Sequence, residues 1–202
     1  MTNPMQNLVA DTLSRFRGSV RNWSGGLVTL DLDIVNVPHP VTELGTLGDN
    51  YWVGPSQVRN DIDRYAPTGT YDSIFVVWEP KDAASGQRIP TAAWGLTLPP
   101  GSWSNNSGFS SVITPTWAWW WTDSIAPEEV FIHEWMHQVL YWQEQHERLT
   151  LDLHSGGTYG YESVNGTWKR WLSDLMQGNV RDGNHFTGVD REMWAADQPT
   201  RP

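Results

Sequence analysis

Length, composition and charge describe one folded domain and argue against several kinds of partner. The chain has 202 residues, 39% of them hydrophobic and 12% aromatic, which is enough for a sizeable core and too apolar for a disordered chain. Its 23 acidic and 13 basic residues give a formal charge of −10, which argues against a nucleic-acid backbone or an anionic membrane surface as a partner. There is no cysteine, so any metal site has to use His, Asp or Glu.

The sequence shows no membrane segment and no secretory signal. No run approaches the roughly 18 apolar residues that a membrane helix needs, so we expect no membrane-spanning part. Residues 1–18 lack the basic segment and long apolar core of a secretory signal. The compartment and the oligomeric state stay open, with secretion the localisation that we favour.

The first part of the chain, about residues 20–120, is rich in predicted strands. In residues 27–37 apolar and acidic side chains alternate, which is the pattern of a half-buried strand. Residues 55–66 begin with Pro55 and carry apolar side chains at helical spacing, which predicts a short helix. Residues 71–80 are β-branched and aromatic and predict a buried strand.

Two more extended segments follow, at residues 91–100 and 110–119. The segments between them are rich in Gly, Pro, Ser and Asn, which is a loop composition. No repeat and no linker divides the chain, so we expect one domain over residues 1–202.

Residues 127–147, PEEVFIHEWMHQVLYWQEQHE, predict a helix of about five turns. Pro127 suits the first helical position, and the two glutamates after it suit the positive end of the helix dipole. At about 100° per residue the helix has an apolar and a polar face. The apolar face carries Ile132, Trp135, Met136 and Val139, and the polar face carries His133, His137, Tyr141 and Glu144.

The polar face has the spacing of a metal site. His133 and His137 lie one helical turn apart, so both imidazoles can bind one Zn²⁺ at about 2.0 to 2.1 Å. Glu134 projects beside the metal without having to be a ligand, and it can take a proton from zinc-bound water.

The segment HEWMH matches H-E-x-x-H and resembles the active-site helix of the zincin superfamily of zinc metallopeptidases. The resemblance covers five residues of motif and the order of strands and helix over residues 27–147. It implies Zn²⁺ bound by His133 and His137, with Glu134 as general base. It also implies an α+β zincin-like fold, in which a mixed N-terminal sheet with a helix precedes the active-site helix and a helical part at about residues 125–180.

A catalytic zinc site needs a third protein ligand. The metzincin pattern is excluded, because Leu140 and Gln143 stand where it has Gly and His. His146 lies about 13 Å along the helix from His137 and cannot reach the metal. We favour His154, in a loop that can bring its imidazole back to the helix.

The alternative third ligand is Glu162, which would make the site resemble the gluzincin type. However, Glu162 precedes the next predicted helix, residues 166–177, instead of lying within it, and no N-E-x-x-x-D pattern surrounds it. Asp152, or no third ligand at all, also stays open.

Several aromatic residues are candidates for contact with the substrate. Tyr161, in preference to Tyr159, can stabilise an oxyanion opposite the metal, although tyrosines in turns more often pack. Trp94 and Trp120 are candidate substrate contacts. Trp120 belongs to a cluster with Trp117, Trp119 and Trp121, for which burial in the core is the favoured interpretation and an exposed aromatic platform the other.

The rest of the chain is expected to be structural. The helix at residues 166–177 carries apolar side chains at helical spacing and should belong to the core. Its Asp174 is either a solvated carboxylate or an acceptor for a zinc-bound histidine. Residues 181–202 are expected to form a loosely packed end, in which His185 has no part in the metal site.

We therefore expect a zinc metallopeptidase that cleaves peptide or protein substrates. The segment at residues 91–98 is the candidate edge strand for pairing with an extended peptide. Two alternatives stay open: a zinc hydrolase of a non-peptide amide, and a catalytically silent binding domain that keeps the metal or the aromatic surface.

Overall fold

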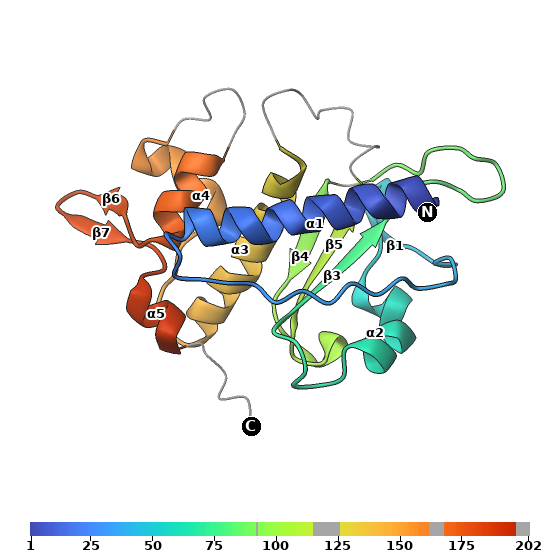
Figure 1. Ribbon diagram of the computed structural model, residues 1–202, viewed down its shortest axis with the longest axis horizontal. Helices are drawn as coiled ribbons and strands as arrows, with labels where there is room; N and C mark the ends of the chain where they lie inside the picture. The colour runs from blue at the N-terminus through green and yellow to red at the C-terminus, as the bar shows by residue number, and fades with distance from the viewer. Residues whose placement is uncertain (92, 115–125, 162–167, 197–202) are drawn as a thin grey trace.

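The computed structural model describes residues 1–91, 93–114, 126–161 and 168–196 (Figure 1). It has the expected α+β class. The helices and strands follow in the order α1 (Asn3–Trp23), β1 (Gly45–Leu47), β2 (Asn50–Trp52), α2 (Arg59–Tyr65), β3 (Ser73–Trp78), β4 (Gly95–Leu98), β5 (Gly108–Ile113), α3 (Pro127–Gln145), α4 (Lys169–Met176), β6 (Val180–Asp182), β7 (His185–Thr187) and α5 (Arg191–Ala196). No helix in these ranges is both long and apolar enough to cross a membrane.

A mixed sheet of three strands lies at the centre of the N-terminal half. Its order is β3-β5-β4, with β3 parallel and β4 antiparallel to β5. These strands confirm the expected strand at residues 71–80 and the first part of the one at residues 110–119. They also confirm that the segment at residues 91–98 contains an edge strand.

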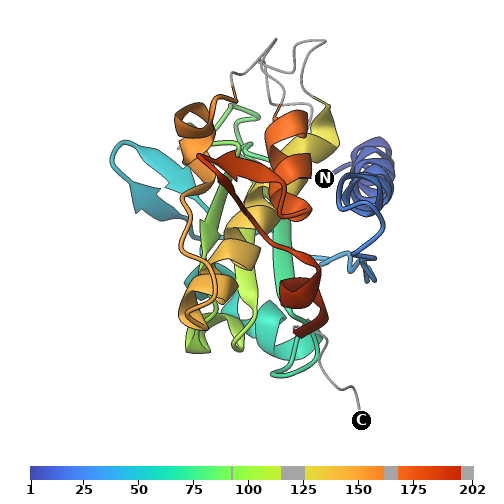
Figure 2. The same ribbon diagram turned by 90° about the vertical axis from the view of Figure 1, so that its left-hand side faces the viewer.

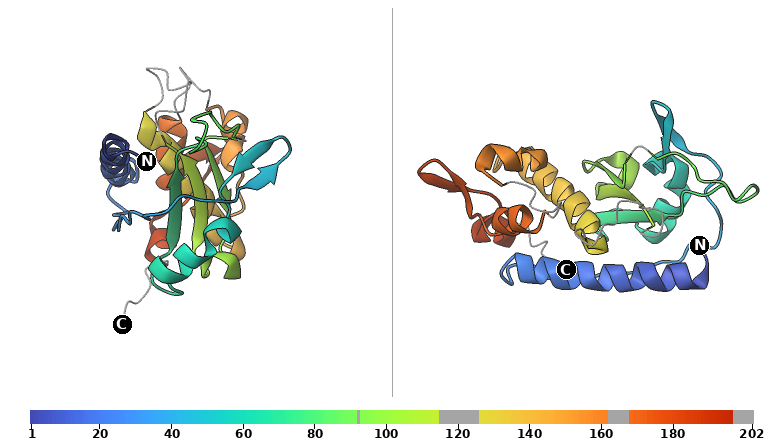
Figure 3. Two further views of the ribbon diagram at one scale, coloured as in Figure 1. Left: turned by 90° about the vertical axis from the view of Figure 1, so that its right-hand side faces the viewer. Right: turned by 90° about the horizontal axis from the view of Figure 1, so that it is seen from above.

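The two faces of this sheet bury different elements. Because side chains alternate along a strand, Phe75, Val77 and Val112 face the core that α1 and α3 cover. The opposite face packs against α2 and against the segment after β2, through Ile74, Val76, Trp78, Phe109 and Ile113. Figures 2 and 3 show the sheet between these layers, with the β1–β2 hairpin projecting at one side.

Helix α1 runs along the length of the molecule and has no counterpart among the elements predicted from the sequence (Figure 3, right). It buries a stripe of side chains spaced three or four residues apart, Val9, Thr12, Phe16, Val20 and Trp23. The Phe16 ring lies 5.8 Å from Phe75 in the sheet and 6.0 Å from Phe131 in α3. The helix therefore joins the sheet to α3.

The prediction of a strand at residues 27–37 is wrong. The segment is irregular and follows α1 back along the molecule (Figure 1), without a strand to pair with among the described residues. The alternation holds only as far as Leu32: Val28, Leu30 and Leu32 pack against the core and the residues between them are exposed, but Ile34, Val35 and Val37 are exposed as well. The pattern thus gave the buried side of an extended segment but could not show that a hydrogen-bonding partner is missing.

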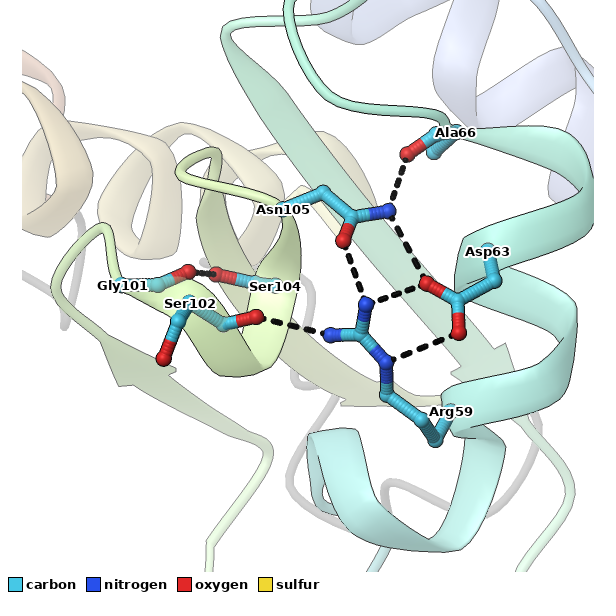
Figure 4. A network of polar contacts seen from close by, with 7 residues as sticks. All are labelled: Arg59, Asp63, Ala66, Gly101, Ser102, Ser104 and Asn105. Atoms are coloured by element: carbon cyan, nitrogen blue, oxygen red, sulfur yellow. Dashed lines mark hydrogen bonds and ion pairs between the residues drawn. The ribbon is translucent and has the colours of Figure 1, made fainter.

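The short helix predicted at residues 55–66 is present as a 3₁₀ turn, η1 (Pro55–Val58), and α2. Figure 4 shows how α2 is joined to the loop before β5. The Arg59 guanidinium contacts Asp63 and Asn105, and its Nη1 donates to the Ser102 carbonyl at 2.8 Å. Asn105, in the left-handed conformation at φ 54°, donates from Nδ2 to the Ala66 carbonyl at 2.9 Å. This network fixes the turn that leads into β5.

The end beyond residue 181, expected to be loosely packed, is mostly exposed over its described residues but contains regular elements and a buried anchor. The chain forms the β6–β7 hairpin and α5, and Val189 between them is fully buried. Trp194 of α5 stacks on Trp135 of α3 at 5.7 Å and donates from Nε1 to the Met176 carbonyl. One large aromatic side chain and a buried valine are enough to anchor a segment whose composition is otherwise polar.

Candidate metal centre

The centre is built on α3, whose extent matches the predicted helix. The expected apolar face is buried, with Ile132 and Met136 fully enclosed. The expected polar face, however, is not open to solvent at its N-terminal end, where His133 is 8% exposed, and Glu134 beside it is 6% exposed. The chain after α3 folds back over this face, so His133 is buried and His137 half-buried, while His154 from the returning chain is exposed.

Three histidines come together beside α3. His133 and His137 lie on the helix, and His154 comes from the 3₁₀ helix η4 (Leu153–Tyr159). One ring nitrogen from each lies within 4.8 Å of the other two. Two nitrogens bound to one tetrahedral zinc at about 2.1 Å lie about 3.4 Å apart, so the three rings have to move closer together to bind one ion. The three histidines can therefore hold a metal ion.

The turn after α3 explains how His154 returns to the helix. Glu147 has a positive φ of 56° and reverses the chain. Asp152 then caps η4, because its Oδ1 accepts a hydrogen bond from the backbone N–H of His154 at 2.9 Å. His146 is used elsewhere, since its Nδ1 lies 2.8 Å from the Trp142 carbonyl at the exposed end of α3. Asp152 thus positions the third histidine from its backbone side.

The environment keeps the two helix imidazoles neutral. Burial, followed by the charge of the neighbouring histidines, lowers the pKa of His133 to about 3 and the pKa of His137 to about 4. Asp152 acts in the opposite direction on His137 and only partly offsets the burial. Neutral imidazole is the form that binds a metal, so these ligands need not lose a proton near neutral pH.

Glu134 lies against strand β4. The Thr97 hydroxyl donates to its Oε2 at 2.6 Å. Burial raises the pKa of Glu134 to about 7, and the Thr97 hydrogen bond acts against this rise. Gly95 makes the approach possible, because a Cβ at that position would lie 2.4 Å from the Glu134 Cγ.

A buried hydrogen-bond chain continues from Glu134 into the sheet. Thr97 and Ser110 hydroxyls lie 2.7 Å apart, the Gln138 amide donates to Ser110 Oγ at 2.6 Å, and the Ser73 hydroxyl donates to Gln138 Oε1. Since Thr97 gives its only proton to Glu134, Ser110 must donate to Thr97. Each hydrogen bond of this series is therefore donated in the direction of the Glu134 carboxylate.

This series of hydrogen bonds was not predicted from the sequence. Its only sequence signal is that Gln138 follows Glu134 by one helical turn, which places both side chains on the same side of α3. Gly108 makes room for Gln138 as Gly95 does for Glu134, since a Cβ there would lie 2.3 Å from the Gln138 Oε1. The serine and threonine partners come from three different strands and show no spacing that a sequence pattern could detect.

Aromatic rings cover the imidazoles on the other side. Trp168, just before α4, lies 4.4 Å from His133 between ring centroids, and Tyr141 lies 6.2 Å from His137. Trp94, expected to contact substrate, is half-buried at the start of β4 and lies 5.7 Å from Trp168. The site therefore has an aromatic wall formed by Trp94 and Trp168.

Tyr161, expected to stabilise an oxyanion, contacts residues of α4. Its hydroxyl donates to Asp174 Oδ2 at 2.8 Å, and its ring contacts Trp171. Burial and the Asp174 carboxylate raise its pKa to about 12. None of the three histidine rings contacts Tyr161 within the described residues, so Tyr141 is the tyrosine that the structure places beside the cluster.

The remaining predicted site residues lie outside the described ranges. These are Glu162, the alternative third ligand, and Trp120 with its neighbours Trp117, Trp119 and Trp121. Comparison of the chain with protein-family models, with curated proteins and with solved structures finds no match.

Proposed function

We propose that this chain is a zinc-dependent hydrolase with a zincin-like fold, and specifically a metallopeptidase. One observation carries the proposal. The two histidines of HEWMH and the later His154 gather their nitrogens within 4.8 Å, while the glutamate of the same motif is buried against an edge strand. A histidine pair that merely faces solvent would have neither a third imidazole nor a buried carboxylate beside it.

His133, His137 and His154 are the proposed zinc ligands. Three neutral nitrogen ligands are a set found in catalytic zinc sites, and with no cysteine in the chain a thiolate site is excluded. When bound, zinc would act as a Lewis acid and make a water molecule acidic enough to react near neutral pH.

Glu134 is the proposed general base. A carboxyl group with a pKa of about 7 is matched to proton transfer at neutral pH, because it can both accept a proton from water and give it to a leaving amine. Thr97 holds one carboxylate oxygen, so the carboxylate has a fixed orientation and the other oxygen is left for the proton.

Strand β4 is the proposed binding edge for the substrate. It pairs with β5 on one side and is the last strand of its sheet among the described residues. An extended peptide can add to such an edge through main-chain hydrogen bonds. It would run past Gly95 and Thr97, the two residues of β4 that contact Glu134, so its carbonyl groups would pass close to the proposed base.

The proposal is tested by metal content and peptide cleavage together. We expect the purified protein to carry about one zinc per chain by mass spectrometry, and to cleave casein or a peptide library until a chelator removes the metal. Less than a tenth of an equivalent after zinc addition would contradict the metal site. Zinc binding with amide but not peptide hydrolysis, or with no hydrolysis at all, would instead support a non-peptide amidase or a binding domain.

A further inference from the structure

The ring of His133 is fixed by packing. Ring nitrogens of metal-binding histidines commonly bond to a carboxylate, a backbone carbonyl or water, which sets the orientation of the ring. In the described part of the chain, no protein hydrogen bond reaches a ring nitrogen of His133, His137 or His154. The orientation of the nearly buried His133 ring is therefore set by the side chains that pack on it.

The closest ring to His133 is the indole of Trp168. Their centroids lie 4.4 Å apart with an angle of 32° between the planes, nearer than either of the other two imidazoles at 4.8 and 5.0 Å. Trp94 packs on Trp168 in turn. An indole at this distance covers one face of the imidazole and restricts its rotation.

Glu129 holds Trp168 in this position. It lies one helical turn before His133 on α3 and is 5% exposed. Its Oε2 accepts a hydrogen bond from the backbone N–H of Trp168 at 3.1 Å, and its Oε1 lies 3.4 Å from the backbone N–H of Ala126. A buried carboxylate needs such donors, and here they join the start of α3 to the start of α4.

We propose that Trp168, held by Glu129, is a positioning residue that sets the His133 ring for metal binding. The inference rests on the proposed zinc function, because it assigns Trp168 a role towards that metal. It predicts that metal affinity depends on the indole even though Trp168 offers no ligand atom. It also predicts that a smaller aromatic ring at this position keeps most of the effect.

The experiment measures zinc affinity by competition with a chromophoric chelator. We expect Trp168→Ala to bind zinc about 10 to 100-fold more weakly, as for lost supporting contacts in other metal sites. Trp168→Phe should stay within a few-fold of wild type, and Glu129→Ala should fall between the two. The matched control is Trp194→Ala, which removes another half-buried indole that packs on α3 through Trp135 and touches no histidine.

A second measurement needs no metal. In the metal-free protein the indole should shift the ring-proton NMR signals of His133, and Trp168→Ala should remove that shift while Trp194→Ala leaves it. If Trp168→Ala does not fold, Trp168→Leu takes its place. Equal affinity losses in Trp168→Ala and Trp194→Ala, or no loss in Trp168→Ala, would overturn the inference while leaving the zinc site intact. A wild-type protein without zinc affinity would overturn the proposed function and this inference together.

Discussion

The two sides of helix α3 hold their polar groups by different forces. On the side of the sheet, Glu134 and Gln138 are fixed by a chain of hydrogen bonds through Thr97, and two glycines give them room. On the adjoining face, about 100° round the helix, His133 and His137 lie among aromatic rings. The proposed base thus has a hydrogen-bonded environment with a set proton direction, whereas the proposed ligands keep their ring nitrogens free of protein partners. Free nitrogens are what a metal requires.

The substitution Glu134→Gln should show the largest difference between the role of the carboxylate in turnover and the role of the histidines in zinc binding. The amide is nearly isosteric but cannot accept a proton, so we expect turnover to fall by about 10² to 10⁴-fold while zinc content is unchanged. Peptide cleavage and metal analysis on the same sample measure both. Glu144→Gln, an exposed glutamate of the same helix, is the control and should keep full activity. Glu134→Gln activity within a few-fold of wild type would show that Glu134 is not the base.

The ligand side is tested by His154→Ala. Because it removes a proposed metal bond, zinc affinity should fall by more than the 10 to 100-fold that is typical of supporting residues. His146→Ala, eight residues earlier and exposed, should have no effect. Glu162→Ala should do much less than His154→Ala in the same titration. The reverse result would make Glu162 the third ligand and the site gluzincin-like.

The pH dependence of stability separates the two sides in the metal-free protein. The folded pKa of Glu134 is raised from 4.5 to about 7, so its stabilising contribution is complete below 4.5 and is lost as the pH rises through 7. The folded pKa values of His133 and His137 are lowered, so their contribution is present above 6.5 and is lost as the pH falls. The histidine effect is common to wild type and Glu134→Gln and cancels in their difference.

Glu134→Gln should therefore gain stability relative to wild type by up to about 3 kcal/mol between pH 4.5 and 8, at about 1.4 kcal/mol per pKa unit. Urea unfolding of the chelated proteins at several pH values measures the difference. A difference that does not change with pH would mean that Glu134 is not buried as a free acid.

The smallest expected effect concerns the space beside Glu134. In Gly95→Ala the new methyl group would meet the Glu134 side chain, so we expect a loss of about 1 to 3 kcal/mol of stability and reduced turnover. Gly18→Ala, in α1 with open space around it, should stabilise the protein by about 0.4 to 1 kcal/mol instead. Thermal unfolding of both variants measures whether each substitution lowers or raises the stability. Equal effects would refute the close approach of β4 to the base.

The local parts of the site could be predicted from the sequence, because they depend on spacing within one helix. The periodicity of residues 127–147 gave α3 nearly to its ends, and one turn of helix places His133 beside His137. His154 could be chosen on reach and on its loop setting. The hydrogen bonds that lead to Glu134 could not be predicted, since Thr97, Ser110 and Ser73 come together only when three strands are in register.

Errors in the fold have a similar cause. The alternation correctly gave the buried side of residues 28–32, but not of residues 33–37, which are exposed, and a strand also needs a partner, which is a property of the whole sheet. Tyr161 was chosen for its closeness in sequence to His154. In space it is closer to Asp174 and Trp171, because η4 ends at Tyr159 and the chain then turns towards α4.

The contacts of α1 affect how the protein folds during its synthesis. Arg15 pairs with Glu128, and the Trp23 carbonyl accepts hydrogen bonds from Ser173 and Gln177, which are 150 and 154 residues further along. Helix α1 therefore has packing partners that are synthesised more than 100 residues after it. Closing such long loops is slow, so the part of α1 that packs on α3 and α4 stays uncovered until residues 127–177 have been synthesised, and this is the interval in which chaperone binding would be of most use.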